Sequence, residues 1–161
     1  MSAAPETVAP DWRAAYDARV ARLRAQYDAI PAGAPVRLAK RTSHLFRQRD
    51  ESTTPGLDVA DFDGVLQVDP VARTAEVQGM TTYEHLVEAT LPHGLMPLCV
   101  PQLKTITLGG AVTGLGIEST SFSWGLPHES VIEMDVLTGD GRVLTVSGRD
   151  DDPHRDLYYG F

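Results

Sequence analysis

The sequence predicts a mixed fold of helices and antiparallel β-hairpins, and three observations support this. Apolar residues recur at helical spacing over 11–30. Apolar and polar residues alternate on both sides of turn residues over 64–78 and again over 132–147, which is typical of hairpins. No strand–helix–strand unit of a parallel sheet surrounds the glycine-rich segment at 105–121. The 161 residues suit one domain.

The N-terminal part reads as a tail followed by a helix. We expect residues 1–10, rich in Ala, Pro and Thr, to be disordered. A helix should begin at its N-cap Asp11, end near Asp28 and be followed by a short strand over 36–39 and a polar, irregular stretch over 40–55. The large apolar residues of one helix face should pack on the rest of the protein: Trp12, Tyr16, Val20, Leu23, Tyr27 and Ile30.

A hairpin and a second helix follow. The hairpin should span 64–78, with its turn at 69–70. The apolar side chains that share a direction in it are Leu66 with Val68, and Ala75 with Val77. The helix should run from Thr82 to Leu91, and Thr81 with Glu84 should form its capping box. Its buried stripe would consist of Tyr83, Leu86, Val87 and Leu91.

The rest of the chain alternates irregular and extended segments. Residues 95–101 are apolar but hold two prolines, which favours buried irregular backbone or an edge strand. Ile132, Met134 and Val136 predict a half-buried strand that returns over 142–147. The aspartates at 150–152 read as a solvated loop, and the aromatic residues that follow look like the start of another element. We therefore expect an N-terminal fragment.

Composition excludes several classes of function. The net charge is −8, which disfavours a broad basic face for nucleic acid. The single cysteine, Cys99, excludes an internal disulfide and a Cys-rich zinc site, and we predict no metal. Nothing approaches ~18 consecutive apolar residues, and residues 1–10 lack the pattern of a secretory signal. We expect a cytoplasmic protein that binds a small molecule, and leave its oligomeric state open.

Basic charge gathers early in the chain. Residues 1–49 hold nine basic and four acidic residues, a net +5, so the remainder carries −13. The first four arginines suit a solvated helix face. The later basic residues lie where no helical stripe runs, so we expect them to line a loop that can meet an anion. They are Arg37, Lys40, Arg41, Arg47 and Arg49.

The segment from Thr105 to Ser121 is the most informative stretch. Glycines stand at 109, 110, 114 and 116, and hydroxyl residues at 105, 107, 113, 119, 120 and 121. Glycines let the backbone approach a ligand, and successive free N–H groups can hold a phosphate. No Gly-Lys-Ser/Thr follows Gly114, and Ser119 replaces the third glycine of a dinucleotide fingerprint. The spacing leaves two interpretations equal: a phosphate-bearing cofactor, or tight packing that needs small residues.

The run from Leu103 to Ser121, continued by Trp-Gly-Leu-Pro-His at 124–128, resembles the Δ24-sterol reductase (diminuto-like) branch of FAD-linked oxidases. These proteins have a p-cresol methylhydroxylase-type FAD-binding domain of the vanillyl-alcohol oxidase superfamily. Further matches are Val-Asp at 68–69, 98–101, Asp-Gly at 140–141 and Asp-Leu-Tyr-Tyr at 156–159. They keep the family's order over about 36–161, which is far more specific than a lone glycine motif.

The resemblance implies an α+β fold of two small subdomains with FAD between them. It divides the chain into a tail at 1–10, a helix at 11–33 and an incomplete FAD-binding domain at 34–161. An early loop with Arg41, Thr42 and Ser43 would meet the FAD diphosphate. The glycine segment would wrap the nucleotide through Thr105, Thr107, Leu108, Gly109, Gly110, Ala111, Val112, Thr113, Gly114, Leu115, Gly116, Ile117, Glu118 and Ser119.

The same resemblance implies a flavin-dependent oxidoreductase that transfers hydride through FAD. The histidine-bearing loop of covalent flavoproteins is not seen, so we expect non-covalent FAD. The family's chemistry is reduction of a carbon–carbon double bond, here of a sterol-like or other lipophilic substrate, with NADPH as candidate electron donor. No acid or base can be named in these residues, so we expect the fragment alone to be inactive.

Two alternatives stay open: a nucleotide-binding or interaction module without turnover, and an FAD-linked sugar or alcohol oxidase of the same superfamily. Single residues also have two interpretations. Glu118 would bind a ribose hydroxyl or cap the next turn. Phe122 and Trp124 would stack on the cofactor or, as we favour, pack in the core. His128 would approach the flavin or, as we favour, be a hydrogen-bonded structural residue.

Overall fold

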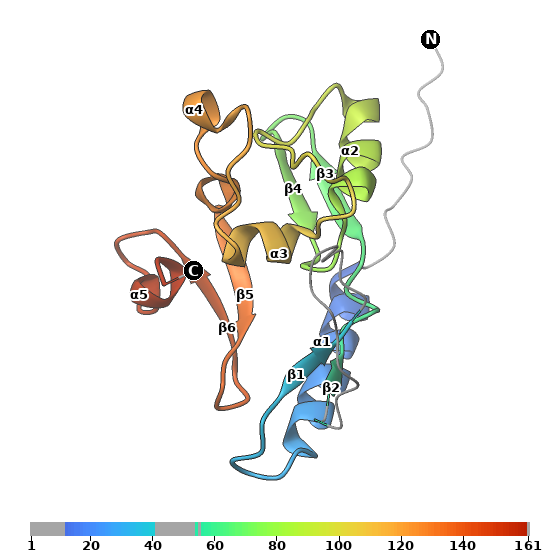
Figure 1. The fold of residues 1–161 in the computed structure, drawn as a ribbon, viewed down its shortest axis with the longest axis vertical. Helices are drawn as coiled ribbons and strands as arrows, with labels where there is room; N and C mark the ends of the chain where they lie inside the picture. The colour runs from blue at the N-terminus through green and yellow to red at the C-terminus, as the bar shows by residue number, and fades with distance from the viewer. Residues whose placement is uncertain (1–11, 41–53, 55, 161) are drawn as a thin grey trace.

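The computed structural model describes residues 12–40, 54 and 56–160. The predicted tail at 1–10, the N-cap Asp11 and the loop residues Arg41, Thr42 and Ser43 lie outside this part. The described residues form helices and three two-stranded sheets, which confirms the α+β class. Figure 1 shows how these elements are arranged. The elements are α1 (Trp12–Asp28), β1 (Arg37–Ala39), β2 (Gly56–Asp58), β3 (Val65–Asp69), β4 (Thr74–Val77), α2 (Tyr83–Thr90), η1 (Leu91–His93), α3 (Leu108–Thr113), α4 (Ser121–Trp124), η2 (Pro127–Ser130), β5 (Glu133–Leu137), β6 (Val143–Ser147) and α5 (Arg155–Tyr158).

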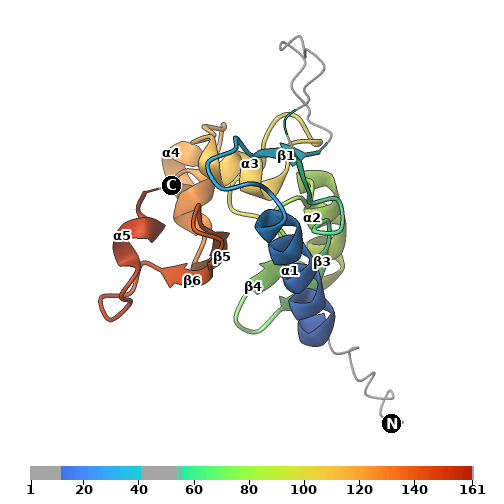
Figure 2. The same ribbon diagram turned by 90° about the horizontal axis from the view of Figure 1, so that it is seen from below.

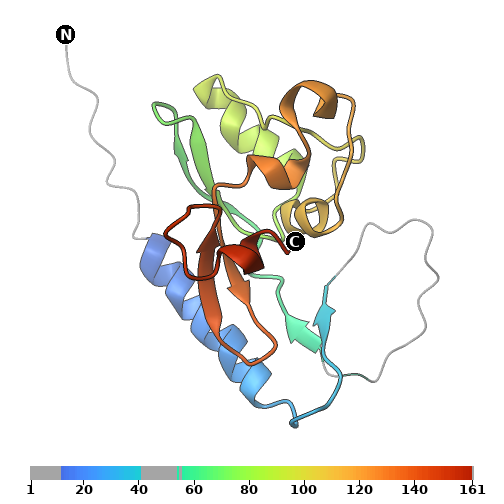
Figure 3. The same cartoon turned by 90° about the vertical axis from the view of Figure 1, so that its left-hand side faces the viewer.

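Helix α1 has the predicted length and the predicted inner face. All six residues of its apolar stripe are buried or half-buried, and Leu23 packs with Leu57 of β2 in one core cluster. The Tyr16 hydroxyl donates to Asp135 of β5 at 2.6 Å, and the Tyr27 hydroxyl donates to the carbonyl of Gly139. Burial, followed by the bond to Asp135, raises the pKa of Tyr16. The helix therefore lies along the β5–β6 hairpin, as Figure 3 shows.

Strand β1 confirms the predicted short strand over 36–39, but β2 and its parallel pairing with β1 were not predicted. Arg37 pairs with Gly56 and Ala39 with Asp58. The predicted irregular stretch ends directly before β2. Strand β2 has only three residues, which is too few to show an alternation of polar and apolar residues. The sequence pattern therefore did not predict this strand. Leu57 at its centre is only 3% exposed and joins the sheet to α1.

The hairpin β3–β4 is antiparallel, as predicted. The predicted alternation of side chains is interrupted in β3. The register shifts between Val65 and Gln67, which places Leu66 in an irregularity of the kind called a β-bulge. Val65 pairs with Val77, and both pack against the second core cluster around α2 and α3. The irregularity lies in β3, so Ala75 and Val77 of β4 share one face as predicted, although Ala75 is exposed and Val77 is half-buried.

Helix α2 begins one residue later than its predicted capping box. Thr82 is the N-cap, and its hydroxyl accepts from the amide of His85 at 3.3 Å. Thr81 is fully buried, and its hydroxyl bonds to Gly64 instead. The buried stripe ends at Thr90, while Leu91 is 52% exposed, because the chain tightens into η1 after Thr90. The predicted capping box and the predicted burial of Leu91 are therefore wrong.

The C-terminal hairpin is β5–β6, which stands with α5 to one side of the other elements (Figure 2). Ile132 precedes the strand and is exposed, contrary to its predicted place in the half-buried face. In the predicted loop, Asp150 and Asp151 are exposed, whereas Asp152 accepts from the amide and hydroxyl of Ser147 at 2.6 and 2.8 Å. Every helix in the described residues is too short or too polar to cross a membrane.

The turn of this hairpin predicts an acid-dependent change in stability. A hydrogen bond from the Thr138 hydroxyl, followed by bonds from Arg142, lowers the pKa of Asp140 to about 2 from the usual 3.8. Because the folded pKa lies below the unfolded one, this stabilisation is present above pH 3.8 and is lost as pH falls toward about 2. We expect Asp140→Asn to remove that part of the acid-induced fall in unfolding free energy.

The measurement is urea unfolding at a series of pH values across this window, for the wild type and Asp140→Asn. Asp151→Asn is the matched control, because Asp151 is exposed and its carboxylate makes no hydrogen bond within the described residues. A wild-type slope that Asp140→Asn leaves unchanged would contradict the assignment.

Candidate functional site

The first half of the glycine segment is bonded into the fold. Leu108 donates its amide to the carbonyl of Thr81, and Gly109 donates to that of Gly79, both at 2.8 Å. The Gly110 amide donates to the hydroxyl of Thr107, the N-cap of α3, at 3.3 Å. The first amides of this short helix therefore already have hydrogen-bond partners within the protein. In this half of the segment, the small residues serve tight packing, which was one of the two interpretations of the glycine spacing.

Small residues are needed in this half because backbones approach closely. A Cβ on Gly109 would lie 2.8 Å from the carbonyl oxygen of Gly79. Ala111 and Val112 are buried, and Ala111 belongs to the core cluster with Tyr83 and Leu86. This half anchors the segment to the β3–β4 and α2 unit.

The second half, residues 113–120, runs from the last residue of α3 into a largely exposed loop with open amides. Helix α3 ends with the Gly116 amide donating to the carbonyl of Ala111 at 3.2 Å, and Leu115 adopts a φ of +50°. That is the left-handed position that usually holds glycine after a helix. From Leu115 onward, four amides make no hydrogen bond with any other described residue: those of Leu115, Ile117, Ser119 and Thr120. These four are called the open amides below.

Hydrogen bonds hold this loop against residues 98–102. A carboxylate oxygen of Glu118 accepts from the amide of Gln102 at 3.1 Å, so Glu118 does not cap the next turn with its carboxylate. The Ser121 hydroxyl accepts from the amide of Glu118 at 3.0 Å and lies 3.3 Å from Sγ of Cys99. The Thr120 hydroxyl donates to the carbonyl of Leu98 at 3.3 Å.

Four large apolar residues lie within or next to the loop in sequence, and their side chains are exposed. Ile117 is 76% exposed and Phe122 is 91% exposed. Leu115 and Trp124 are also exposed, which makes core packing of Phe122 and Trp124 wrong. We call Leu115, Ile117, Phe122 and Trp124 the apolar rim; α4, which holds two of them, lies at the end of the molecule opposite β1 and β2 (Figure 1).

Other predicted residues lie apart from the loop or serve the scaffold. Thr105 is exposed at the start of the segment, and the Thr113 hydroxyl donates back to the carbonyl of Gly109 at 2.8 Å. His128 lines a surface pocket with Met134 and Tyr158. Its Nδ1 is buried without a hydrogen-bond partner, so the predicted hydrogen-bonded structural role is not seen at that atom.

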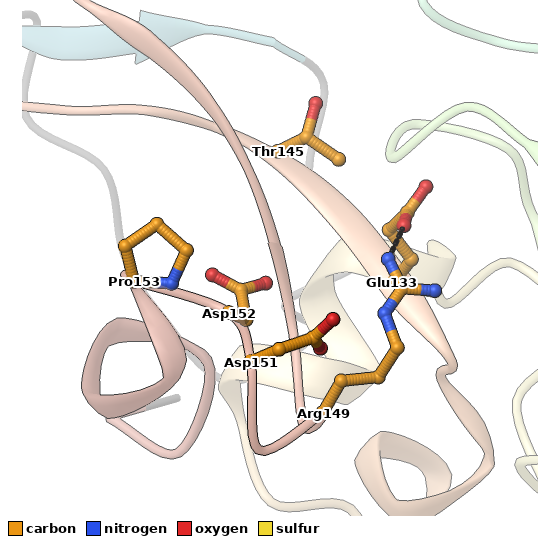
Figure 4. A pocket seen from close by; sticks show the side chains of 6 residues that line it. All are labelled: Glu133, Thr145, Arg149, Asp151, Asp152 and Pro153. Atoms are coloured by element: carbon orange, nitrogen blue, oxygen red, sulfur yellow. Dashed lines mark hydrogen bonds and ion pairs between the residues drawn. The ribbon is translucent and has the colours of Figure 1, made fainter.

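A second surface hollow lies beside β5 and β6 and holds none of the predicted site residues. Figure 4 shows Glu133, Thr145, Arg149, Asp151, Asp152 and Pro153 around it. Arg149 pairs with Glu133 at 2.8 Å, and Asp152 is bonded to Ser147. No group of three His, Cys, Asp or Glu suited to a metal occurs in the described part of the chain. The open amides are therefore the better candidate site.

Comparison with known protein families gives one match that covers most of the chain. A family described as "FAD binding domain" matches residues 25–147. The match includes both halves of the glycine segment, β5 and all of β6.

Comparison with curated proteins gives relatives of modest identity. The Delta(24)-sterol reductase of Pisum sativum is 28% identical over 103 residues, 64% of this chain and 18% of that protein. Cytokinin dehydrogenase 6 of Oryza sativa subsp. japonica is 36% identical over 81 residues, 50% of this chain and 15% of that protein. The decaprenylphosphoryl-beta-D-ribose oxidase of Mycolicibacterium smegmatis is 31% identical over 99 residues, 60% and 21% respectively. The chain thus spans about a fifth of the length of these relatives.

Proposed function

Since the chain belongs to the FAD binding domain family, as its match over residues 25–147 shows, we propose that it is the FAD-binding part of a flavin-dependent oxidoreductase. The protein would transfer hydride through non-covalently bound FAD. The observation that supports this best is the set of four open amides in an exposed loop within the family match. Backbone N–H groups without internal partners are suited to the oxygens of a diphosphate or a flavin carbonyl.

The residues fit the cofactor in two respects. The open amides supply neutral donors, and the exposed hydroxyl residue Ser119 adds another beside them. Neutral donors also suit a chain with a net charge of −8, because they bind an anion without a basic face. We propose that the loop over 113–120 contacts FAD through the open amides and Ser119, while Thr107 to Val112 hold the loop in place. The role of Arg41, Thr42 and Ser43 stays a prediction.

FAD, when bound, supplies two-electron chemistry, and the protein supplies binding, orientation and exclusion of water. The open amides would donate to cofactor oxygens and fix its position. The apolar rim would shield the same region from solvent, which strengthens those hydrogen bonds by lowering the local dielectric constant. In the described residues we assign no proton-transferring group.

A lipophilic substrate fits the apolar rim. Leu115 keeps its side chain at a φ of +50°, where glycine would relieve strain of about 1 kcal/mol. We infer that the exposed side chain of Leu115 is kept in this strained position because it contacts the substrate. We propose reduction of a carbon–carbon double bond in a sterol-like or other lipophilic substrate, with NADPH as the electron donor; the similarity to a protein named Delta(24)-sterol reductase supports this class.

A second candidate is an oxidase or dehydrogenase, since relatives named decaprenylphosphoryl-beta-D-ribose oxidase and cytokinin dehydrogenase match over similar parts of the chain. The reaction of the reduced flavin with oxygen separates the two: rapid reoxidation favours an oxidase, and slow reoxidation a reductase. A binding module without turnover would show neither substrate reduction nor oxidation. The cytoplasmic location stays a prediction.

The test of FAD binding is a fluorescence titration of the purified chain with FAD, followed by competition with ADP and with riboflavin. We expect FAD to bind, ADP to compete because it has the diphosphate, and riboflavin to compete poorly. Catalytic competence is a separate measurement, made by bleaching the bound flavin with NADPH. A folded chain that leaves FAD fluorescence unchanged would contradict the proposal.

A further inference from the structure

The open amides lie in a loop that has little apolar anchoring of its own. Leu115 and Ile117, which alternate with glycines there, are both exposed rather than buried. Ordering a loop of this kind for a ligand costs conformational free energy unless internal contacts have already ordered it. The hydrogen bonds to residues 98–102 are therefore the feature that presets the positions of the amides.

Glu118 makes two hydrogen bonds that hold the loop, one through its side chain and one through its backbone amide. Its side-chain carboxylate accepts from the amide of Gln102 at 3.1 Å. Its own amide donates to the hydroxyl of Ser121 at 3.0 Å. Open amides precede and follow Glu118 directly in the chain, at 117 and 119, so the bond from the Glu118 amide orients the peptide between them, and the carboxylate holds Glu118 against Gln102.

Ser121 connects the loop to the buried part of residues 98–102. Its hydroxyl lies 3.3 Å from Sγ of Cys99, and Cys99 is only 2% exposed. The same hydroxyl receives the Glu118 amide. A chain of contacts thus leads from the core through Cys99 and Ser121 to the peptide between two open amides.

We propose that Glu118 and Ser121 are positioning residues for FAD, an inference that rests on the proposed function. They do not themselves touch the cofactor in this scheme. They hold the open amides in the arrangement that receives cofactor oxygens. Their loss should weaken FAD binding and alter the surroundings of the bound flavin, while the core clusters stay folded.

The first measurement is the dissociation constant of FAD for variants of the full chain. Glu118→Ala and Ser121→Ala should each bind FAD about five- to tenfold more weakly, the effect of losing one hydrogen bond. Glu118→Gln keeps an acceptor for Gln102, and Ser121→Thr keeps the hydroxyl, so both should bind within about twofold of the wild type. Glu88→Ala is the matched control, because Glu88 is exposed on α2 and makes no hydrogen bond within the described residues.

The second measurement is the absorption spectrum of the bound flavin at saturating FAD, together with the thermal midpoint of the apoprotein. Positioning predicts a spectral shift in Glu118→Ala that Glu118→Gln restores. A lower melting temperature with unchanged affinity and spectrum would show a merely structural role and would overturn the inference. If Glu118→Ala fails to fold, Ser121→Ala against Ser121→Thr makes the same comparison.

The two proposals fail in different ways. Wild-type chain that does not bind FAD overturns the proposed function and the positioning role with it. Wild-type chain that binds FAD, with Glu118→Ala and Ser121→Ala binding equally well and giving the same spectrum, overturns the positioning role alone.

Discussion

Gly109→Ala is expected to lower the free energy of unfolding by about 2–4 kcal/mol. The new Cβ would lie 2.8 Å from the carbonyl oxygen of Gly79, and that oxygen also accepts the Gly109 amide at 2.8 Å. Both groups belong to the backbone, so neither can turn aside as a flexible side chain would. The better helix propensity of alanine, worth about 1 kcal/mol, offsets only part of this cost.

The measurement is urea unfolding followed by circular dichroism. Gly79→Ala is the matched control, because a Cβ there has no other atom within 4 Å. We expect that control to change stability by less than about 0.5 kcal/mol. A Gly109→Ala protein as stable as the wild type would mean that α3 does not pack on Gly79 as described. FAD affinity should fall with stability, because α3 anchors the loop of open amides.

Thr81→Val is expected to lower the free energy of unfolding by about 2–4 kcal/mol. The Thr81 side chain is fully buried, and its hydroxyl both accepts from the amide of Gly64 at 2.8 Å and donates to its carbonyl at 2.9 Å. Valine keeps the shape but leaves the Gly64 amide without a partner. The Gly64 carbonyl still receives the amide of Gln78 at 3.0 Å, so the amide is the main loss.

Thr74→Val is the control for this prediction, because the Thr74 hydroxyl makes no hydrogen bond within the described residues and valine suits a strand. Thr81→Ser restores the hydroxyl and should recover most of the stability. Equal stability of Thr81→Val and Thr74→Val by urea unfolding would refute the role of the buried hydroxyl.

Elements with a strong period were predictable from the sequence. The stripe of α1 is repeated over many turns, and its six residues are all at least half-buried. Features that depend on one or two residues were not predictable. Thr81 and Thr82 are both suitable N-caps in sequence, and only the bonds from Thr81 to Gly64 exclude it from capping. Strand β2 is three residues long and is defined by its parallel partner β1, which is distant in sequence.

The position of the candidate site in the chain was predictable from the sequence. The division of the segment into a half bonded into the fold and a half with open amides was not. Glycine spacing identified residues 105–121, and the FAD family match includes them. Sequence could not distinguish amides bonded to Gly79 and Thr81 from the open amides beyond Leu115, because the partners come from another part of the chain. The exposed state of Phe122 and Trp124 was missed because aromatic residues usually indicate core.

The contacts between α1 and the β5–β6 turn bear on the order in which the chain folds. Tyr16 and Asp135 are 119 residues apart, and Tyr27 and Gly139 are 112 apart. Helix α1 can form within microseconds of leaving the ribosome. Its tyrosines can bond to Asp135 and Gly139 only after the β5–β6 hairpin has been synthesised. Until then its apolar face is open to wrong partners, so a chaperone should protect the nascent chain most during this interval.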